Sequence, residues 1–118
     1  MGVRLLTSVS ECSKCGLCKG VCPILRVTKE ESKGPRCRVL QINEKAEDFT
    51  LIYSTLCSAC DAACPVGIEI SKDILAARER LVSKGIETPA NKKMIENIRK
   101  YGNPFGKIEG KPKELFCC

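Results

Sequence analysis

Two runs of cysteine have the spacing of iron-sulfur ligands. The first run is Cys12-x2-Cys15-x2-Cys18-x3-Cys22, and proline follows its last cysteine. In bacterial proteins with this spacing, three thiolates hold one 4Fe-4S cluster and the cysteine before proline serves a second cluster. The second run repeats the last three positions, at Cys57, Cys60 and Cys64, again with proline next. The sequence therefore predicts two clusters in one chain, an arrangement that passes single electrons.

Composition supports metal binding over other uses of cysteine. The chain has 118 residues, ten cysteines, two tyrosines, three phenylalanines and no tryptophan or histidine. So small a domain with so few large apolar side chains needs extra stabilisation, which bound metal clusters provide. The lack of histidine excludes Rieske centres, mixed cysteine and histidine zinc sites and imidazole-based catalysis.

Charge and hydropathy indicate which partners and which compartment to expect. The formal net charge is +6, but a 4Fe-4S core with four thiolates carries roughly −2, so two clusters would lower the total to about +2. Few aromatic side chains are present to stack on bases, so we expect no nucleic-acid partner. We also expect no membrane span, because no apolar stretch is long enough. The chain shows no apolar export segment, and its many thiols suit a reducing compartment, so we expect a cytoplasmic protein.

Apolar periodicity predicts helices and no strands. Residues between the two runs suit two short helices with a hinge near residues 44–47. Ser71 is the expected N-cap of a helix that ends at Gly85 and has one apolar face. That face is predicted to contain Ile74, Leu75, Leu81 and Val82. A last helix is expected to begin at Thr88-Pro89 and to end at Gly102.

Three segments carry a resemblance to a known family. They are SKCGLCKGVCPILRVT, GPRCRVL and STLCSACDAACPVGIEI. Together they resemble the helical two-cluster ferredoxin module of heterodisulfide reductase subunits. The chain is also similar to iron-sulfur subunits of anaerobic glycerol-3-phosphate dehydrogenase, of glycolate and lactate oxidases and, more distantly, of succinate dehydrogenase. The resemblance is strong over residues 8–80 and weaker over residues 98–106.

The resemblance implies a fold and a domain organisation. We expect an all-α, small helical ferredoxin-like domain over residues 1–86, with two iron-sulfur clusters wedged between helices. Residues 87–118 are expected to form a helix and tail that dock to a partner. In larger relatives this region leads into cysteine-rich CCG domains. We expect any such chemistry to lie on another subunit.

The resemblance also implies that each cluster takes ligands from both runs. The first cluster would be bound by Cys12, Cys15, Cys18 and Cys64. The second would be bound by Cys57, Cys60, Cys22 and a fourth ligand at the position where this chain has Ser54. Cys37 in GPRC is the predicted substitute. The alternatives are a 3Fe-4S cluster that lacks one iron, or oxygen ligation by Ser54 or Asp61.

The predicted function is electron transfer within a larger oxidoreductase complex. The implied partner is a flavoprotein or a CCG-domain redox subunit in a hetero-oligomer. No nucleophile and base pair or Gly-rich phosphate loop is present, so we expect an electron-transfer subunit that is not itself catalytic. The alternative is a cysteine-rich zinc module that binds a partner. Cys117 and Cys118 are interpreted as thiols at a frayed end, with a metal site shared with a partner as the second possibility.

Overall fold

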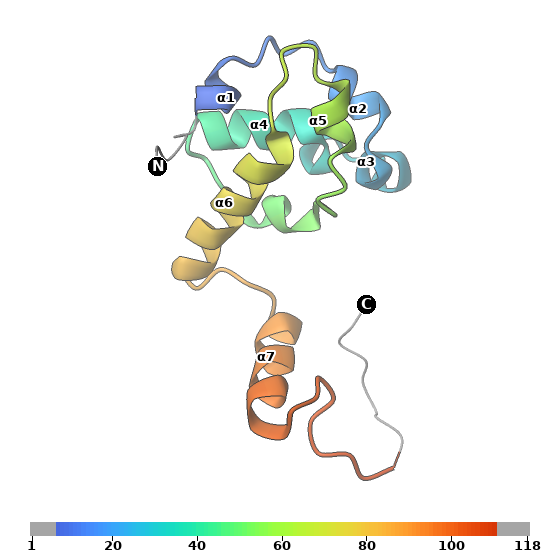
Figure 1. Ribbon diagram of the computed structural model, residues 1–118, viewed down its shortest axis with the longest axis vertical. Coiled ribbons are helices and arrows are strands. Elements are labelled where there is room, and N and C mark those ends of the chain that lie inside the picture. The colour runs from blue at the N-terminus through green and yellow to red at the C-terminus, as the bar shows by residue number, and fades with distance from the viewer. Residues whose placement is uncertain (1–6, 111–118) are drawn as a thin grey trace. The chain divides into compact units, whose positions relative to one another are not determined.

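The computed structural model describes residues 7–110, with side chains from residue 9 onward. Figure 1 shows the order of the helices. The elements are α1 (Thr7–Ser10), α2 (Leu17–Gly20), α3 (Pro23–Thr28), η1 (Glu31–Lys33), α4 (Pro35–Asn43), η2 (Phe49–Tyr53), α5 (Ala59–Ala63), α6 (Ile70–Ser83) and α7 (Pro89–Tyr101). Residues 7–110 contain no strand, so the prediction of an all-α fold is confirmed.

The chain divides into two compact units, and the division falls between Lys84 and Gly85. The first unit contains both cysteine runs, and the second contains α7. Cys117 and Cys118 lie outside the described residues. No helix in the described part of the chain combines the length and the apolar character that crossing a bilayer requires.

Local sequence explains where the helices begin and end. Proline occupies the first turn of α4 and of α7, where its missing N–H would have no partner in any case. The Thr88 side chain caps α7 by accepting a hydrogen bond from the Asn91 backbone N–H at 3.2 Å. Gly102 ends α7 with a φ of 73°, a conformation that suits glycine. The predicted bounds of this helix are confirmed.

The segment between the runs has the predicted hinge but a different second element. Helix α4 ends at Asn43, and the chain turns before η2 begins at Phe49. The Asp48 side chain accepts a hydrogen bond from the Thr50 backbone N–H at 2.8 Å, which starts η2 as a 3₁₀ helix. The second of the two predicted helices is therefore a short 3₁₀ segment.

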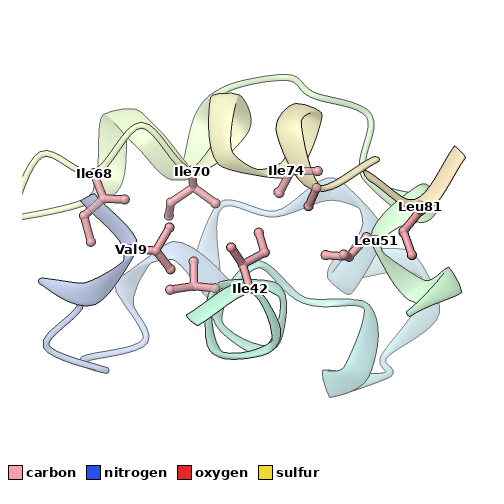
Figure 2. Packing of buried hydrophobic residues seen from close by; sticks show 9 residues of the cluster. Val9, Ile42, Leu51, Ile68, Ile70, Ile74 and Leu81 are labelled. Carbon is pink, nitrogen blue, oxygen red and sulfur yellow. The ribbon is translucent and has the colours of Figure 1, made fainter. Parts of the chain in front are cut away.

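A single hydrophobic core lies between α6 and the helices that precede it. Figure 2 shows Ile68, Ile70 and Ile74 facing Val9 and Ile42 across this core. Val39 is also buried there, and Leu51, Ala77 and Leu81 are completely buried. Four cysteines pack against the same core from outside it: Cys12, Cys18, Cys60 and Cys64. The core therefore helps to fix the positions of these four cysteines.

The predicted apolar face of α6 was wrong in two positions. Ile74 and Leu81 are buried, but Leu75 and Val82 are 48% and 50% exposed. The buried stripe instead contains Ile70, Ile74, Ala77 and Leu81, which follow the helical repeat of about 3.6 residues. The predicted N-cap was also wrong. Helix α6 already includes Ser71, because its first residue is Ile70.

Candidate functional site

The first of two cysteine-lined cavities joins the two runs. Its thiols come from Cys12, Cys15, Cys18 and Cys64. Apolar side chains from Val39, Ile68 and Ile70 line the same cavity. Three cysteines of the first run and the last cysteine of the second run thus surround one space.

The second cavity has the reciprocal composition. Its thiols come from Cys22, Cys57 and Cys60, and Ser54 lines it as well. Arg38, Ile24 and Leu56 complete much of its wall. The last cysteine of the first run therefore lies with two cysteines of the second run.

The backbone repeats itself around the two runs. Gly16 and Ser58 both have a left-handed conformation, with φ values of 80° and 59°, and each precedes the short helix that carries the next cysteine. Cys22 has φ and ψ of −78° and 118°, and Cys64 has −76° and 117°. Proline follows both. The two halves of the site are therefore built by the same local geometry.

Ser54 occupies the position in the second run that Cys12 occupies in the first. The Cys12 sulfur accepts a hydrogen bond from the Lys14 backbone N–H at 3.4 Å. The Ser54 hydroxyl accepts the matching bond from the Leu56 backbone N–H at 3.2 Å. Lys14 and Leu56 share a left-handed backbone, with φ values of 59° and 56°. The Ser54 Oγ is thus held where the repeat would place a sulfur.

The two other candidates for the fourth ligand lie beside the second cavity but are not among the residues that line it. Cys37 is half-buried on α4, lines neither cavity, and acts electrostatically on Arg38 of the second cavity wall. The Asp61 carboxylate accepts a hydrogen bond from the Cys60 thiol at 3.6 Å. It also accepts hydrogen bonds from the Ser71 backbone N–H at 2.9 Å and from the Ser71 hydroxyl. These bonds connect α5 to α6. Cys37 as a ligand therefore stays a prediction from the sequence alone.

The thiols differ in exposure and acidity. Cys15 and Cys57 are exposed, and Cys22 is buried. The Leu17 backbone N–H and the Ser13 side chain lower the pKa of Cys15. The Ala59 backbone N–H and the Thr55 side chain lower the pKa of Cys57 in the same way. These two outer cysteines are the ones that ionise most readily for metal binding.

Burial and crowding act on the inner thiols in the opposite sense. Burial, followed by the negative charges of Cys12, Cys15 and Cys64, raises the pKa of Cys18. This coupling shows that the four sulfurs of the first cavity lie close enough to influence one another. Burial and the neighbouring Asp61 carboxylate raise the pKa of Cys60 to about 12. Thiolates gathered in this way need a cationic group between them.

Two arginines that the sequence interpretation did not single out line the cavities. Arg36 lines the first cavity, and its Nε is buried without a hydrogen-bond partner. Arg38 lines the second cavity, is 2% exposed, and has neither Nε nor Nη2 paired. The only signal was that both flank Cys37 in GPRCR, between the runs. Buried guanidinium N–H groups without an acceptor fit an anionic group in each cavity, as a thiolate-ligated cluster is.

Among the side chains that the structure describes, no three histidine, cysteine, aspartate or glutamate residues gather as the ligands of a single metal ion do.

Comparison with known proteins agrees with this geometry. Residues 8–68 match the model of the 4Fe-4S dicluster domain. The chain is 26% identical over 104 residues to an iron-sulfur subunit of the CoB-CoM heterodisulfide reductase of Methanocaldococcus jannaschii, covering 87% of this chain and 56% of that protein. It is 36% identical over 95 residues to lactate utilization protein B of Bacillus licheniformis, covering 74% of this chain and 20% of that protein.

A third relative belongs to the first group. The chain is 30% identical over 97 residues to the corresponding subunit of the ferredoxin/F420H2-dependent CoB-CoM heterodisulfide reductase of Methanosarcina acetivorans, covering 78% of this chain and 58% of that protein. The chain thus spans somewhat more than half the length of the heterodisulfide reductase subunits and a fifth of the lactate utilization protein. It belongs to the 4Fe-4S dicluster domain family, and its cofactors are two 4Fe-4S clusters.

Proposed function

We propose that this chain is an electron-transfer iron-sulfur subunit that relays single electrons between redox subunits of a larger oxidoreductase complex. The observation that carries the proposal is the pair of cavities, each lined by cysteines from both runs. The family match supports it over the zinc-binding alternative. Two redox centres in one small domain have a clear use in passing electrons and little use in a purely structural module.

The cavity walls support one proposed set of ligands for each cluster. We assign Cys12, Cys15, Cys18 and Cys64 to the first cluster. Cys22, Cys57 and Cys60 are assigned to the second. Its fourth corner is assigned to the Ser54 hydroxyl, because that hydroxyl accepts the same backbone hydrogen bond as the Cys12 sulfur. A hard oxygen ligand is weaker toward iron-sulfur clusters than thiolate, so this corner is the more labile one.

The surrounding residues determine how electrons reach the site. Bound 4Fe-4S clusters supply one-electron redox chemistry at potentials that charge, hydrogen bonding and exposure determine. The apolar walls from Val39, Ile68 and Ile70 exclude water from the inner side of the first cavity. Cys15 and Cys57 are exposed, so one ligand of each cluster reaches the surface. We assign these two positions to the entry and exit of electrons.

The partner is proposed to be a flavoprotein or a CCG-domain redox subunit. Relatives of this chain are named as subunits of heterodisulfide reductases and as a lactate utilization protein. Helix α7 is the proposed docking element within residues 87–118. None of its residues is buried, and Ile98 and Tyr101 on its apolar face are 46% and 42% exposed. The cytoplasm remains the proposed compartment, because many thiols persist only in a reducing environment.

A redox titration of the anaerobically purified chain tests the function. We expect brown protein with about eight irons per chain and two successive one-electron reductions, because two 4Fe-4S clusters each accept one electron. Electrons should then pass from the reduced chain to oxidised flavin mononucleotide as a surrogate acceptor. Colourless protein containing zinc, or protein whose clusters cannot be reversibly reduced, would refute electron transfer.

A further inference from the structure

The environment of Arg38 is unfavourable for a buried cation unless an anion lies beside it. Arg38 lies on α4, 2% exposed, and its guanidinium forms part of the second cavity wall. Burial lowers the pKa of Arg38, and this effect is opposed by the charge of Cys22, a hydrogen bond to the Cys22 sulfur, and the charges of Cys60 and Cys37. The Nε and Nη2 atoms have no hydrogen-bond acceptor. An unpaired buried N–H group of a charged side chain carries the full desolvation penalty of that group. An anion in the cavity would remove this penalty.

A second cation near Arg38 increases the need for an anion. Burial and the charge of Arg38 lower the pKa of Arg78, so the two guanidinium groups lie within electrostatic range. The N–H groups of Arg78 donate to the backbone carbonyls of Leu51, Ile52 and Ser54. Arg78 therefore binds the backbone of the segment that ends at Ser54. The Nε and Nη2 groups of Arg38 have no such acceptor and could donate to a group bound in the cavity.

The first cavity has a weaker counterpart. Arg36 lines it, but this side chain is only half-buried, and Nε is its one buried atom without a partner. A charge in a half-exposed position is screened more strongly by water than a charge that is fully buried. The two clusters would therefore lie in unequal positive fields.

We propose that Arg38 sets the reduction potential of the second cluster, donating N–H hydrogen bonds to its sulfurs and raising its potential above that of the first. This inference rests on the proposed function. Reduction by an external one-electron donor adds one negative charge to a 4Fe-4S cluster. A fixed cation stabilises the more negative state more strongly, so its presence raises the potential. The first electron to enter the chain then settles on the second cluster.

The test is an EPR-monitored redox titration of the holo chain carrying Arg38→Met. Signals are assigned with Cys57→Ala, which removes a ligand of the second cluster. We expect Arg38→Met to shift the second potential to more negative values and to leave the first unchanged. Arg38→Lys keeps the charge and should shift it less. Arg26→Met makes the same change at an exposed arginine and should move neither potential.

Each outcome decides the inference. Arg38→Met with about eight irons and both potentials unchanged would overturn it, as would equal shifts in both clusters. If Arg38→Met does not retain the second cluster, retention in Arg38→Lys would show that the charge is required and would support the inference. Loss in both variants would assign Arg38 to packing and overturn it. Two reducible clusters in the unaltered chain would leave the proposed function standing in every one of these cases.

Discussion

At the residue scale, backbone conformation directs each thiol toward its cavity. Lys14 and Gly16 in the first run have a left-handed backbone, and Leu56 and Ser58 have it at the matching positions of the second. The backbone therefore changes direction twice in each run before the short helix begins. A non-glycine side chain in this conformation is strained and persists where surrounding structure requires it. Three of these four residues are not glycine. In the described part of the chain five non-glycine residues have a positive φ, and these three are each adjacent in sequence to a cysteine of the runs.

Crossed ligation makes a sharp prediction for Cys64→Ala. Cys64 is the last cysteine of the second run in sequence but lines the first cavity. We expect this variant to lose the first cluster or to convert it to a three-iron form, because one iron loses its thiolate. The second cluster should keep its EPR signal. Iron analysis and EPR check this, and damage confined to the cluster of Cys57 and Cys60 would contradict it.

Variants of Ser54 and Cys37 test which of these residues is the fourth ligand of the second cluster. We expect Cys37→Ser to retain both clusters, because Cys37 lines neither cavity. Ser54→Ala should release iron from the second cluster on exposure to air and give a 3Fe-4S signal. Ser54→Cys should slow that release, since thiolate is the preferred ligand. Selective loss of the second cluster in Cys37→Ser would instead restore Cys37 as its ligand.

Sequence reasoning identified the cysteines but not the arginines. Ligand spacing within a run is a local property, so Cys12, Cys15 and Cys18 were recognisable without a structure. The role of Arg38 depends on how α4 packs beside the second cavity, which no local pattern encodes. The match of Ser54 to Cys12 was visible as spacing, but its hydrogen bond to Leu56 required coordinates.

At the element scale, α6 is the helix against which the elements around both cavities pack. It packs against α4 and α5, and its buried stripe meets the core that also contacts four of the cysteines. The predicted stripe included Leu75 and Val82 because apolar character alone does not distinguish the core from exposed positions. Helix boundaries with strong signals, such as Thr88-Pro89 and Gly102, were predictable because capping is local.

The packing of α6 predicts unequal effects for adjacent residues. Ile74 is 1% exposed, whereas Leu75 is 48% exposed. We expect Ile74→Ala to lower the free energy of unfolding by about 2 to 5 kcal/mol, because it leaves a cavity in the core. Leu75→Ala is the matched control and should change it by less than about 1 kcal/mol. Anaerobic urea denaturation of the holo chain measures both, and equal losses would contradict the assigned stripe.

Helix α7 is expected to affect assembly without affecting the clusters. Ile98→Asn removes an exposed apolar side chain from its proposed docking face. We expect weaker co-purification with a flavoprotein or CCG-domain redox subunit produced together with this chain, and unchanged reduction potentials. Glu96→Asn, on an exposed polar position, is the control. Undiminished co-purification of Ile98→Asn would exclude this face from docking.

At the scale of the whole molecule, the two cavities share one small core. The nine buried core residues lie between α6 and the earlier helices, and no aromatic residue is among them. A domain of this size obtains only modest stability from its core, so metal bonds contribute to folding itself. The surplus of basic residues offsets the negative charge that two clusters bring. Arg38, a buried basic residue, lines the second cavity.

The most direct test of the account is quantitative EPR of the fully reduced holo chain. Two 4Fe-4S clusters built from interleaved ligands must lie close together, so their unpaired electrons should interact. We predict a signal that integrates to about two spins per chain, with about eight irons. Its shape should differ from the sum of the two separate cluster signals. One spin and about four irons per chain would contradict the central claim that this chain holds two clusters side by side.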